Sequence, residues 1–188
     1  MSRTALLLMD FQQAIVARVP GTVVSRAADA RAAAREAGVP VFHIGLQLRP
    51  GHVDVHPRNK LFGSLPADVY TPDDPGTAFA AELTPADGDT VVHKNRVSAF
   101  AGNDLRQLLA ARDITRLVLA GIATSGIVLS TALQAVDLDY AVTVLSDACA
   151  DADPALHTTL LDSVLARRGE VTTVDAWRAA LARTAHTG

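Results

Sequence analysis

Short apolar runs alternate with amphipathic stretches along most of this sequence. The first run, residues 5–9, contains only apolar residues, which is typical of a parallel strand buried on both faces. A helical pattern with alanine-rich and arginine-rich faces follows over residues 23–37, and Gly38 is a residue type that commonly ends a helix. The next apolar run, residues 39–45, predicts a second strand.

The rest of the chain repeats this alternation of strands and helices. We predict further strands at residues 90–93, 116–120, 141–146 and 171–174. We predict further helices at residues 104–112, 130–138, 154–166 and around 175–183. Because strands that alternate with helices are joined by right-handed crossovers, the sequence predicts an α/β fold with a parallel sheet and helices on both of its faces.

Residues 46–89 interrupt this pattern. They are rich in proline, glycine and aspartate and poorly periodic, so we expect short helical turns there. A connection of this length inside a compact domain usually carries a function. We therefore expect the segment to be a functional excursion from the fold.

Composition narrows the class of protein. The 188 residues, 49% of them hydrophobic, are enough to bury the core of one domain spanning residues 1–188. A net charge of -3 gives no reason to expect a nucleic-acid partner, and the apolar run at 5–9 is too short for a membrane span or a signal-peptide core. One cysteine excludes an internal disulfide and fits a reducing compartment, so we expect a cytoplasmic protein.

Three features with chemical potential fall at the ends of predicted strands. Asp10 directly follows the first strand, and Lys94 directly follows the strand at 90–93. The small residues of segment 121–128 join the strand at 116–120 to a helix. Because ligands of such sheets bind beyond the carboxyl ends of the strands, we expect these three features to meet in one site.

The polar residues suggest separate roles. Asp10 has the chemistry of a general acid or base if it lies in a partly dry pocket, and the alternative is a helix cap or a turn residue. Lys94 beside a carboxylate would fix its charge and could bind an anionic substrate. Arg96 offers a planar fork for a substrate carboxylate. Gln12 and Phe100 are further candidates for substrate binding, although Phe100 is equally consistent with a core position.

The 121–128 segment predicts a strand-to-helix turn. Free N–H groups at the start of a helix can bind an anion or an oxyanion even without a nucleophile. Ser125, Gly126 and Ile127 are therefore candidates for substrate contacts. No histidine stands in an obvious partner position for a serine of this turn, so we do not expect a Ser-His-Asp arrangement.

Two other groups of side chains carry weaker signals. Asp54 and His56, with His52 close by, could form part of a metal site, but the ligand set is incomplete, and we expect no metal and no other cofactor. Cys149 follows a predicted buried strand, where a small buried thiol is the ordinary arrangement.

Taken together, these motifs resemble the isochorismatase-like superfamily, often called cysteine hydrolases, which includes nicotinamidases, N-carbamoylsarcosine amidases and isochorismatases. The similar segments stand in family order over nearly the whole chain, at the Asp10 strand and at residues 94–100, 121–135 and 146–151. The resemblance implies one isochorismatase-like hydrolase domain with a Rossmann-like sheet of about six strands, a small-molecule substrate, and a homodimer or homotetramer. It also implies a cis peptide bond just before the turn, between Ile122 and Ala123.

The same resemblance assigns catalytic places. Amidase members of the superfamily use an aspartate, a lysine and a cysteine, and these places fall on Asp10, Lys94 and Ile127. Isoleucine cannot form a thioester. Isochorismatases proper also lack the cysteine, and they hydrolyse a vinyl ether with the aspartate as acid and water attacking afterwards. Residues 94–100 are similar to their K-x-R-x-S-A-F segment. The bulk of Ile127 would either fill the pocket or add an apolar wall that raises the pKa of Asp10.

The expected function is therefore hydrolysis of a small anionic metabolite by non-covalent acid–base chemistry, without a cysteine nucleophile. Asp10 would be the general acid or base, and Lys94 its charge partner. Two alternatives remain open. One is a catalytically silent relative that binds a small molecule or a protein, and the other is a lyase or isomerase that uses the same acid.

Overall fold

The sheet of this protein is parallel and six-stranded within the described part of the chain. A computed structural model describes residues 3–185, so the ends of the expected domain, residues 1–2 and 186–188, lie outside it. The strands are β1 (Arg3–Met9), β2 (Val41–Leu46), β3 (Thr90–Lys94), β4 (Ile114–Ile122), β5 (Ala141–Ala150) and β6 (Glu170–Thr172). Their order in the sheet is β3-β2-β1-β4-β5-β6, which confirms the predicted fold class.

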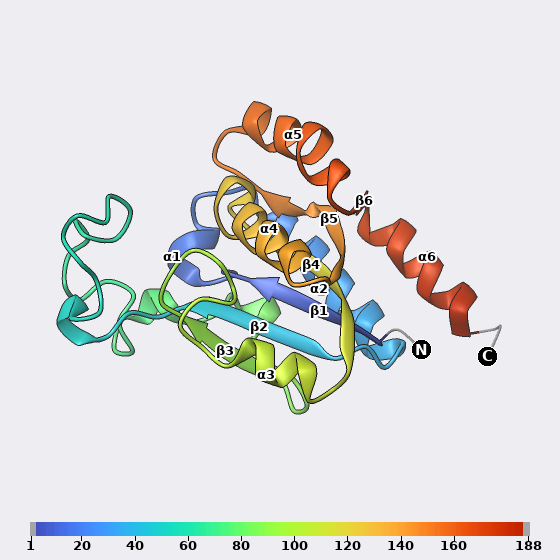
Figure 1. Cartoon of the computed structure of the whole chain (residues 1–188), viewed down its shortest axis with the longest axis horizontal. Helices are drawn as coiled ribbons and strands as arrows, with labels where there is room; N and C mark the ends of the chain where they lie inside the picture. Colours follow the sequence, from blue (N-terminus) through green and yellow to red (C-terminus); the bar gives the residue numbers. More distant parts are fainter. Residues whose placement is uncertain (1–2, 186–188) are drawn as a thin grey trace.

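Helices cover both faces of the sheet (Figure 1). The α-helices of the described residues are α1 (Gln13–Val16), α2 (Thr22–Glu36), α3 (Leu105–Ala110), α4 (Leu129–Asp137), α5 (Pro154–Ser163) and α6 (Val174–Ala185). Residues of α2 and α6 share one core with the sheet, and residues of α3, α4 and α5 share the other. None of these helices is long and apolar enough to cross a membrane.

The central strand β1 shows why its sequence is apolar throughout. Leu6 and Leu8 pack into the core beneath α2 and α6, whereas Leu7 and Met9 pack into the core beneath α3, α4 and α5. All four side chains have no exposed surface. Because successive side chains of a strand point to opposite faces, a strand covered on both sides needs an apolar residue at every position.

Several strand and helix bounds differ by up to three residues from the sequence-based expectation, and two differences are larger. Strand β5 continues to Ala150, because after an irregularity in the β4–β5 pairing Gly121 pairs with Cys149 and Ile122 with Ala150. Helix α1 was not predicted, since one helical turn is too short to show a period.

The long connection between β2 and β3 contains the short helical turns expected of it. They are the 3₁₀ turns η1 (Pro50–His52), η2 (Pro75–Thr77) and η3 (Ala81–Leu83). The Leu48 N–H donates to the Tyr70 carbonyl at 2.8 Å, so the intervening residues form a loop that leaves and returns at one point. This loop projects from the end of the sheet in Figure 1 and is anchored by Phe62, which packs with Leu48 and Tyr70 in a small apolar cluster.

Candidate active site

Asp10 lies at the carboxyl end of β1, next to β4 at the centre of the sheet. Strand order reverses between β1 and β4, and this is where open α/β sheets bind their ligands. The Asp10 backbone has φ = 60°, a left-handed conformation that aspartate tolerates better than most residues. The backbone of Gly121 lies close to that of Met9, because a Cβ atom on Gly121 would meet the Met9 carbonyl oxygen at 2.8 Å. The chain therefore turns sharply at Asp10 within a tightly packed strand end.

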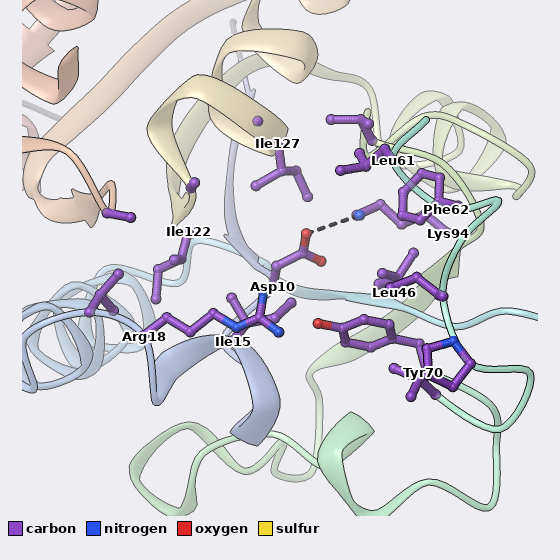
Figure 2. A pocket seen from close by; sticks show the side chains of 18 residues that line it. Asp10, Ile15, Arg18, Leu46, Leu61, Phe62, Tyr70, Lys94, Ile122 and Ile127 are labelled. Atoms are coloured by element: carbon purple, nitrogen blue, oxygen red, sulfur yellow. Dashed lines mark ion pairs between the residues drawn. The ribbon is translucent and has the colours of Figure 1, made fainter. Parts of the chain in front are cut away.

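Asp10 and Lys94 form a buried ion pair. The Lys94 Nζ lies 2.9 Å from Asp10 Oδ2, and it also donates to the Arg96 carbonyl at 3.0 Å. The two residues are 6% and 2% exposed, so water screens this pair very little. The structure thus brings together two residues that the sequence placed only at the ends of separate strands (Figure 2).

Burial raises the pKa of the Asp10 carboxyl above its ordinary value of 3.8, although Lys94 opposes part of this effect. The second carboxylate oxygen, Oδ1, is buried and has no hydrogen-bond partner. Ionisation leaves charge on this oxygen without a hydrogen bond, so burial opposes ionisation of Asp10 while Lys94 favours it. A carboxyl group that holds its proton above the ordinary pKa can serve as a general acid.

The turn after β4 supplies another wall of the site. The peptide bond between Ile122 and Ala123 is cis, which confirms the expectation drawn from the family resemblance. A π-helical turn, η4 (Thr124–Val128), then leads into α4. Ile127 is 2% exposed, and with Gly126 it lines the same cavity as Asp10 and Lys94.

Three N–H groups of this turn donate to other groups of the protein. The Ser125 N–H donates to Asp151 Oδ2 at 2.7 Å. The Gly126 and Val128 N–H groups both donate to the Ala123 carbonyl, at 3.1 and 3.3 Å. Since these three groups are engaged within the protein, they are not available to bind an anion.

The cavity has a volume of about 570 Å³ and is mostly apolar (Figure 2). Its charged residues are Asp10, Lys94 and Arg18. Strand ends and the η4 turn form its inner wall, and the loop closed by Leu48 and Tyr70 forms its outer wall. Its other lining residues are Ile15, Val19, Leu46, Leu61, Phe62, Leu65, Pro66, Val69, Tyr70, Val97, Ile122, Ala123, Gly126, Ile127 and Ala152.

Gln12 and Arg96, two predicted substrate contacts, do not line this cavity. The buried Gln12 amide donates to the carbonyls of Leu46 and Thr77 and accepts from the Leu46 N–H. The Arg96 guanidinium donates to the carbonyls of Asn95 and Asp54. Both side chains therefore join loops to strand ends.

Phe100 and Ser125 also lie outside the cavity lining. The Phe100 ring stacks on Tyr140, and Ser125 is exposed. A histidine does bond to a hydroxyl of this turn, because His157 Nδ1 lies 2.8 Å from Thr124 Oγ1. Thr124 is fully buried and does not line the cavity, so this pair links α5 to the turn.

Sequence reasoning missed Arg18, Phe62 and Tyr70 as site residues. Arg18 follows the single turn of α1, and the other two belong to the long connection between β2 and β3. Neither segment has a period or a strand end that would indicate where its side chains point. Only the path of the loop places them around Asp10.

The candidate metal ligands of the long loop have other partners. His52 Nε2 contacts the Val69 carbonyl at 2.7 Å, and His56 Nδ1 accepts from the Arg58 N–H. Asp54 accepts from Asn95 and from a backbone N–H. Among the residues that the structure describes, no three histidine, cysteine, aspartate or glutamate residues are grouped as a metal site requires.

Cys149 is expected to be unreactive in the folded protein. It is 4% exposed, and burial raises the pKa of its thiol to about 12, so very little thiolate forms at neutral pH. A disulfide exchange reagent should label Cys149 only after denaturation, and Cys149→Ala should retain the parent's turnover. Rapid stoichiometric labelling of the native protein, followed by mass spectrometry, would contradict this expectation.

Comparisons with known proteins agree with the fold. Residues 4–176 match the model of the isochorismatase domain family. The chain is 29% identical to maleamate amidohydrolase of Pseudomonas putida over 91% of its own length and 83% of that protein. It is 34% identical to ureidoacrylate amidohydrolase RutB of Methylobacterium radiotolerans, over 86% and 68%. An isochorismatase family protein from Burkholderia thailandensis has a similar structure, with a TM-score of 0.84, 33% identity and 95% of both chains covered.

Proposed function

The chain belongs to the isochorismatase family of hydrolases, and we propose that it hydrolyses a small anionic metabolite by acid–base chemistry at Asp10, without a covalent intermediate. The observation that carries this proposal is the buried ion pair of Asp10 and Lys94 at the wall of an apolar cavity. An acid with a raised pKa, a fixed cation and a mostly apolar cavity are parts that acid-assisted hydrolysis can use.

The proposed reaction needs only these groups and one water molecule. Asp10 donates its proton to the substrate as the bond to the leaving group breaks. The water oxygen bonds to the carbon, and a proton from that water returns to the Asp10 carboxylate. Lys94 lowers the free energy of the carboxylate that exists between these two proton transfers.

Ile127 supports the non-covalent route. It lines the cavity at the place where the family resemblance puts a cysteine, and its aliphatic side chain has no atom that could attack a substrate. Two relatives are named for hydrolysis of maleamate and ureidoacrylate, both small carboxylates. Their names support a small anionic substrate for this chain as well.

A binding protein without turnover is the second candidate. Ile127 fills part of the cavity wall, and three N–H groups of the η4 turn are engaged within the protein. A site built in this way could hold a small molecule without stabilising a reacting oxyanion. A lyase or isomerase that uses Asp10 as its acid would need the same ion pair.

A substrate panel distinguishes these functions. We expect the full chain to turn over at least one member of a panel of carboxylate-bearing vinyl ethers, amides and esters, with product measured by liquid chromatography and mass spectrometry. In water enriched with oxygen-18, the product should gain one labelled oxygen, and no covalent adduct should appear on the protein. An isomerised product without labelled oxygen would indicate the lyase or isomerase. Failure to convert any member would favour the binding protein.

A further inference from the structure

We propose that Arg18 binds the substrate's carboxylate, and that the substrate is an anion whose apolar body spans from Arg18 to Asp10. This inference rests on the proposed function, because it names the substrate class of the same cavity. Arg18 lies on the turn between α1 and α2 and lines the cavity. Figure 2 shows its guanidinium extended into the cavity below the Asp10 carboxylate, while Tyr70 points its hydroxyl inward from the loop.

The distribution of charge in the cavity favours Arg18 as the anion-binding group. Of the three charged residues that line it, Asp10 and Lys94 neutralise one another as an ion pair. Two of the three donors of Lys94 are already used, one by Asp10 and one by the Arg96 carbonyl. Within the described residues, the Arg18 guanidinium has no hydrogen bond and no ion pair, so its charge is available to a ligand.

The other arginine considered for this role, Arg96, already has hydrogen-bond partners. Its guanidinium donates to the carbonyls of Asn95 and Asp54, and it does not line the cavity. To bind a substrate carboxylate, Arg96 would have to give up bonds that join the long loop to the end of β3. The guanidinium that binds the substrate's carboxylate, which the sequence suggested was that of Arg96, is therefore better assigned to Arg18.

The acidic residues near Arg18 do not pair with its guanidinium. A smaller cavity next to the first is lined by Arg18 together with Asp147 and Asp151. Asp147 pairs with Arg26 at 2.9 Å, and Asp151 accepts the Ser125 N–H at 2.7 Å. Both carboxylates already have partners. Arg18 is exposed, as unpaired arginines usually are, but its side chain also lines the apolar cavity, where the carboxylate of a ligand can reach it.

The backbone that carries Arg18 is held in place. The Arg18 N–H donates to the Ile15 carbonyl at 3.1 Å, and Pro20 fixes the chain two residues later. Helix α1 is tied to the long connection by the bond from the Gln13 N–H to the Ala78 carbonyl. Only the side chain of Arg18 must therefore be ordered when a ligand binds, which limits the entropic cost.

The walls of the cavity define the rest of the substrate. They are aliphatic and aromatic, for example at Ile15, Phe62 and Ile122. A guanidinium binds a carboxylate through two parallel hydrogen bonds, which adds direction to the charge attraction. Together these features fit an aryl or alkenyl carboxylate that places its hydrolysable bond beside Asp10. The cavity's volume lies within the range of roughly 300–1,000 Å³ that small-molecule sites have.

The test uses benzoate as the probe and benzamide as its neutral counterpart of nearly the same shape. Binding to the full chain is measured by calorimetry in the parent and in Arg18→Met, which keeps an apolar stem and removes the charge. We expect Arg18→Met to weaken benzoate binding by at least about tenfold, the effect of one charge-assisted hydrogen bond, and to leave benzamide binding unchanged. Arg106→Met, an exposed arginine on α3, should change neither.

Other outcomes decide against the inference. Equal benzoate affinity in the parent and Arg18→Met, or no benzoate binding to the parent, would overturn it. A loss in Arg96→Met with none in Arg18→Met would return the anion site to Arg96. Asp10→Asn should still bind benzoate, so failure of the proposed hydrolysis and failure of this inference give different results. With a substrate in hand, Arg18→Met should raise KM more than it lowers kcat.

Discussion

Asp10→Asn is expected to lower turnover by about 10²–10⁴-fold, the usual contribution of a general acid–base group. Asparagine keeps the shape of the side chain and tolerates the left-handed backbone at this position, but it cannot supply a proton. The measurement is kcat/KM of the parent and the variant on any substrate that the panel identifies. Turnover in the Asn variant equal to that of the parent would rule out Asp10 as the acid.

A matched control is available in Asp139, which is exposed, lies outside the cavity and also has a positive φ of 64°. Asp139→Asn should retain the parent's activity. Thermal melts of both variants are needed, because Asp10→Asn leaves Lys94 without its carboxylate partner. A variant that melts like the parent but turns over slowly has lost chemistry and not its fold.

The pH profile of the parent gives an independent check on this role. A general acid works in its protonated form, so kcat/KM should fall as the pH rises through the pKa of Asp10. Because burial raises that pKa, the fall should begin above the ordinary carboxyl value of 3.8. The same limb should be absent from the residual activity of Asp10→Asn. If kcat/KM of the parent already falls at pH values below 3.8, this would contradict the raised pKa.

Lys94→Met is expected to lower the free energy of unfolding by about 3–5 kcal/mol at neutral pH, the cost of removing one partner of a buried ion pair. Lys94 lowers the pKa of Asp10, so its removal lets that pKa rise further. A group with a raised folded-state pKa favours folding below its unfolded value and loses this contribution as the pH rises. The destabilisation should therefore be small near pH 3.8 and grow toward neutral pH.

Urea unfolding at both pH values measures this effect. The double variant Asp10→Asn with Lys94→Met removes both charges, so it should be more stable at neutral pH than Lys94→Met alone. If Lys94→Met is as stable as the parent at neutral pH, the pair does not have the buried electrostatic coupling described here. A destabilisation that is the same at both pH values would point to lost packing of the lysine stem.

The apolar pattern predicted the sheet well because β1 is buried on both faces and admits no polar residue. The same pattern located Asp10 and Lys94, since a charged residue directly after a buried strand must lie at the strand's end. Helix α1 and the extension of β5 escaped prediction. The extension of β5 depends on pairing between distant segments, such as Gly121 with Cys149, and α1 is a single helical turn, too short to show a period.

Arg18 and Arg96 show the limit of reading roles from sequence. Arg96 follows Lys94 closely and has the right chemistry, yet its guanidinium bonds a carbonyl from Asp54, far away in the sequence. Arg18 stands in a short turn without a motif, yet its side chain lines the cavity. The spacing of a motif indicates where along the fold a side chain is attached. The partners that compete for its side chain depend on the path of loops, which spacing does not encode.

The loop between Leu48 and Tyr70 has a consequence for how this cavity could change over evolution. Because the loop's two ends are hydrogen-bonded together, its length and sequence can vary while the sheet keeps its strand ends in place. The loop supplies Leu61, Phe62 and other residues of the outer wall, whereas Asp10 comes from the sheet. Part of the cavity's outer wall and the Asp10 carboxyl thus come from separate stretches of sequence, so exchanging the loop alone should reshape that wall without moving Asp10.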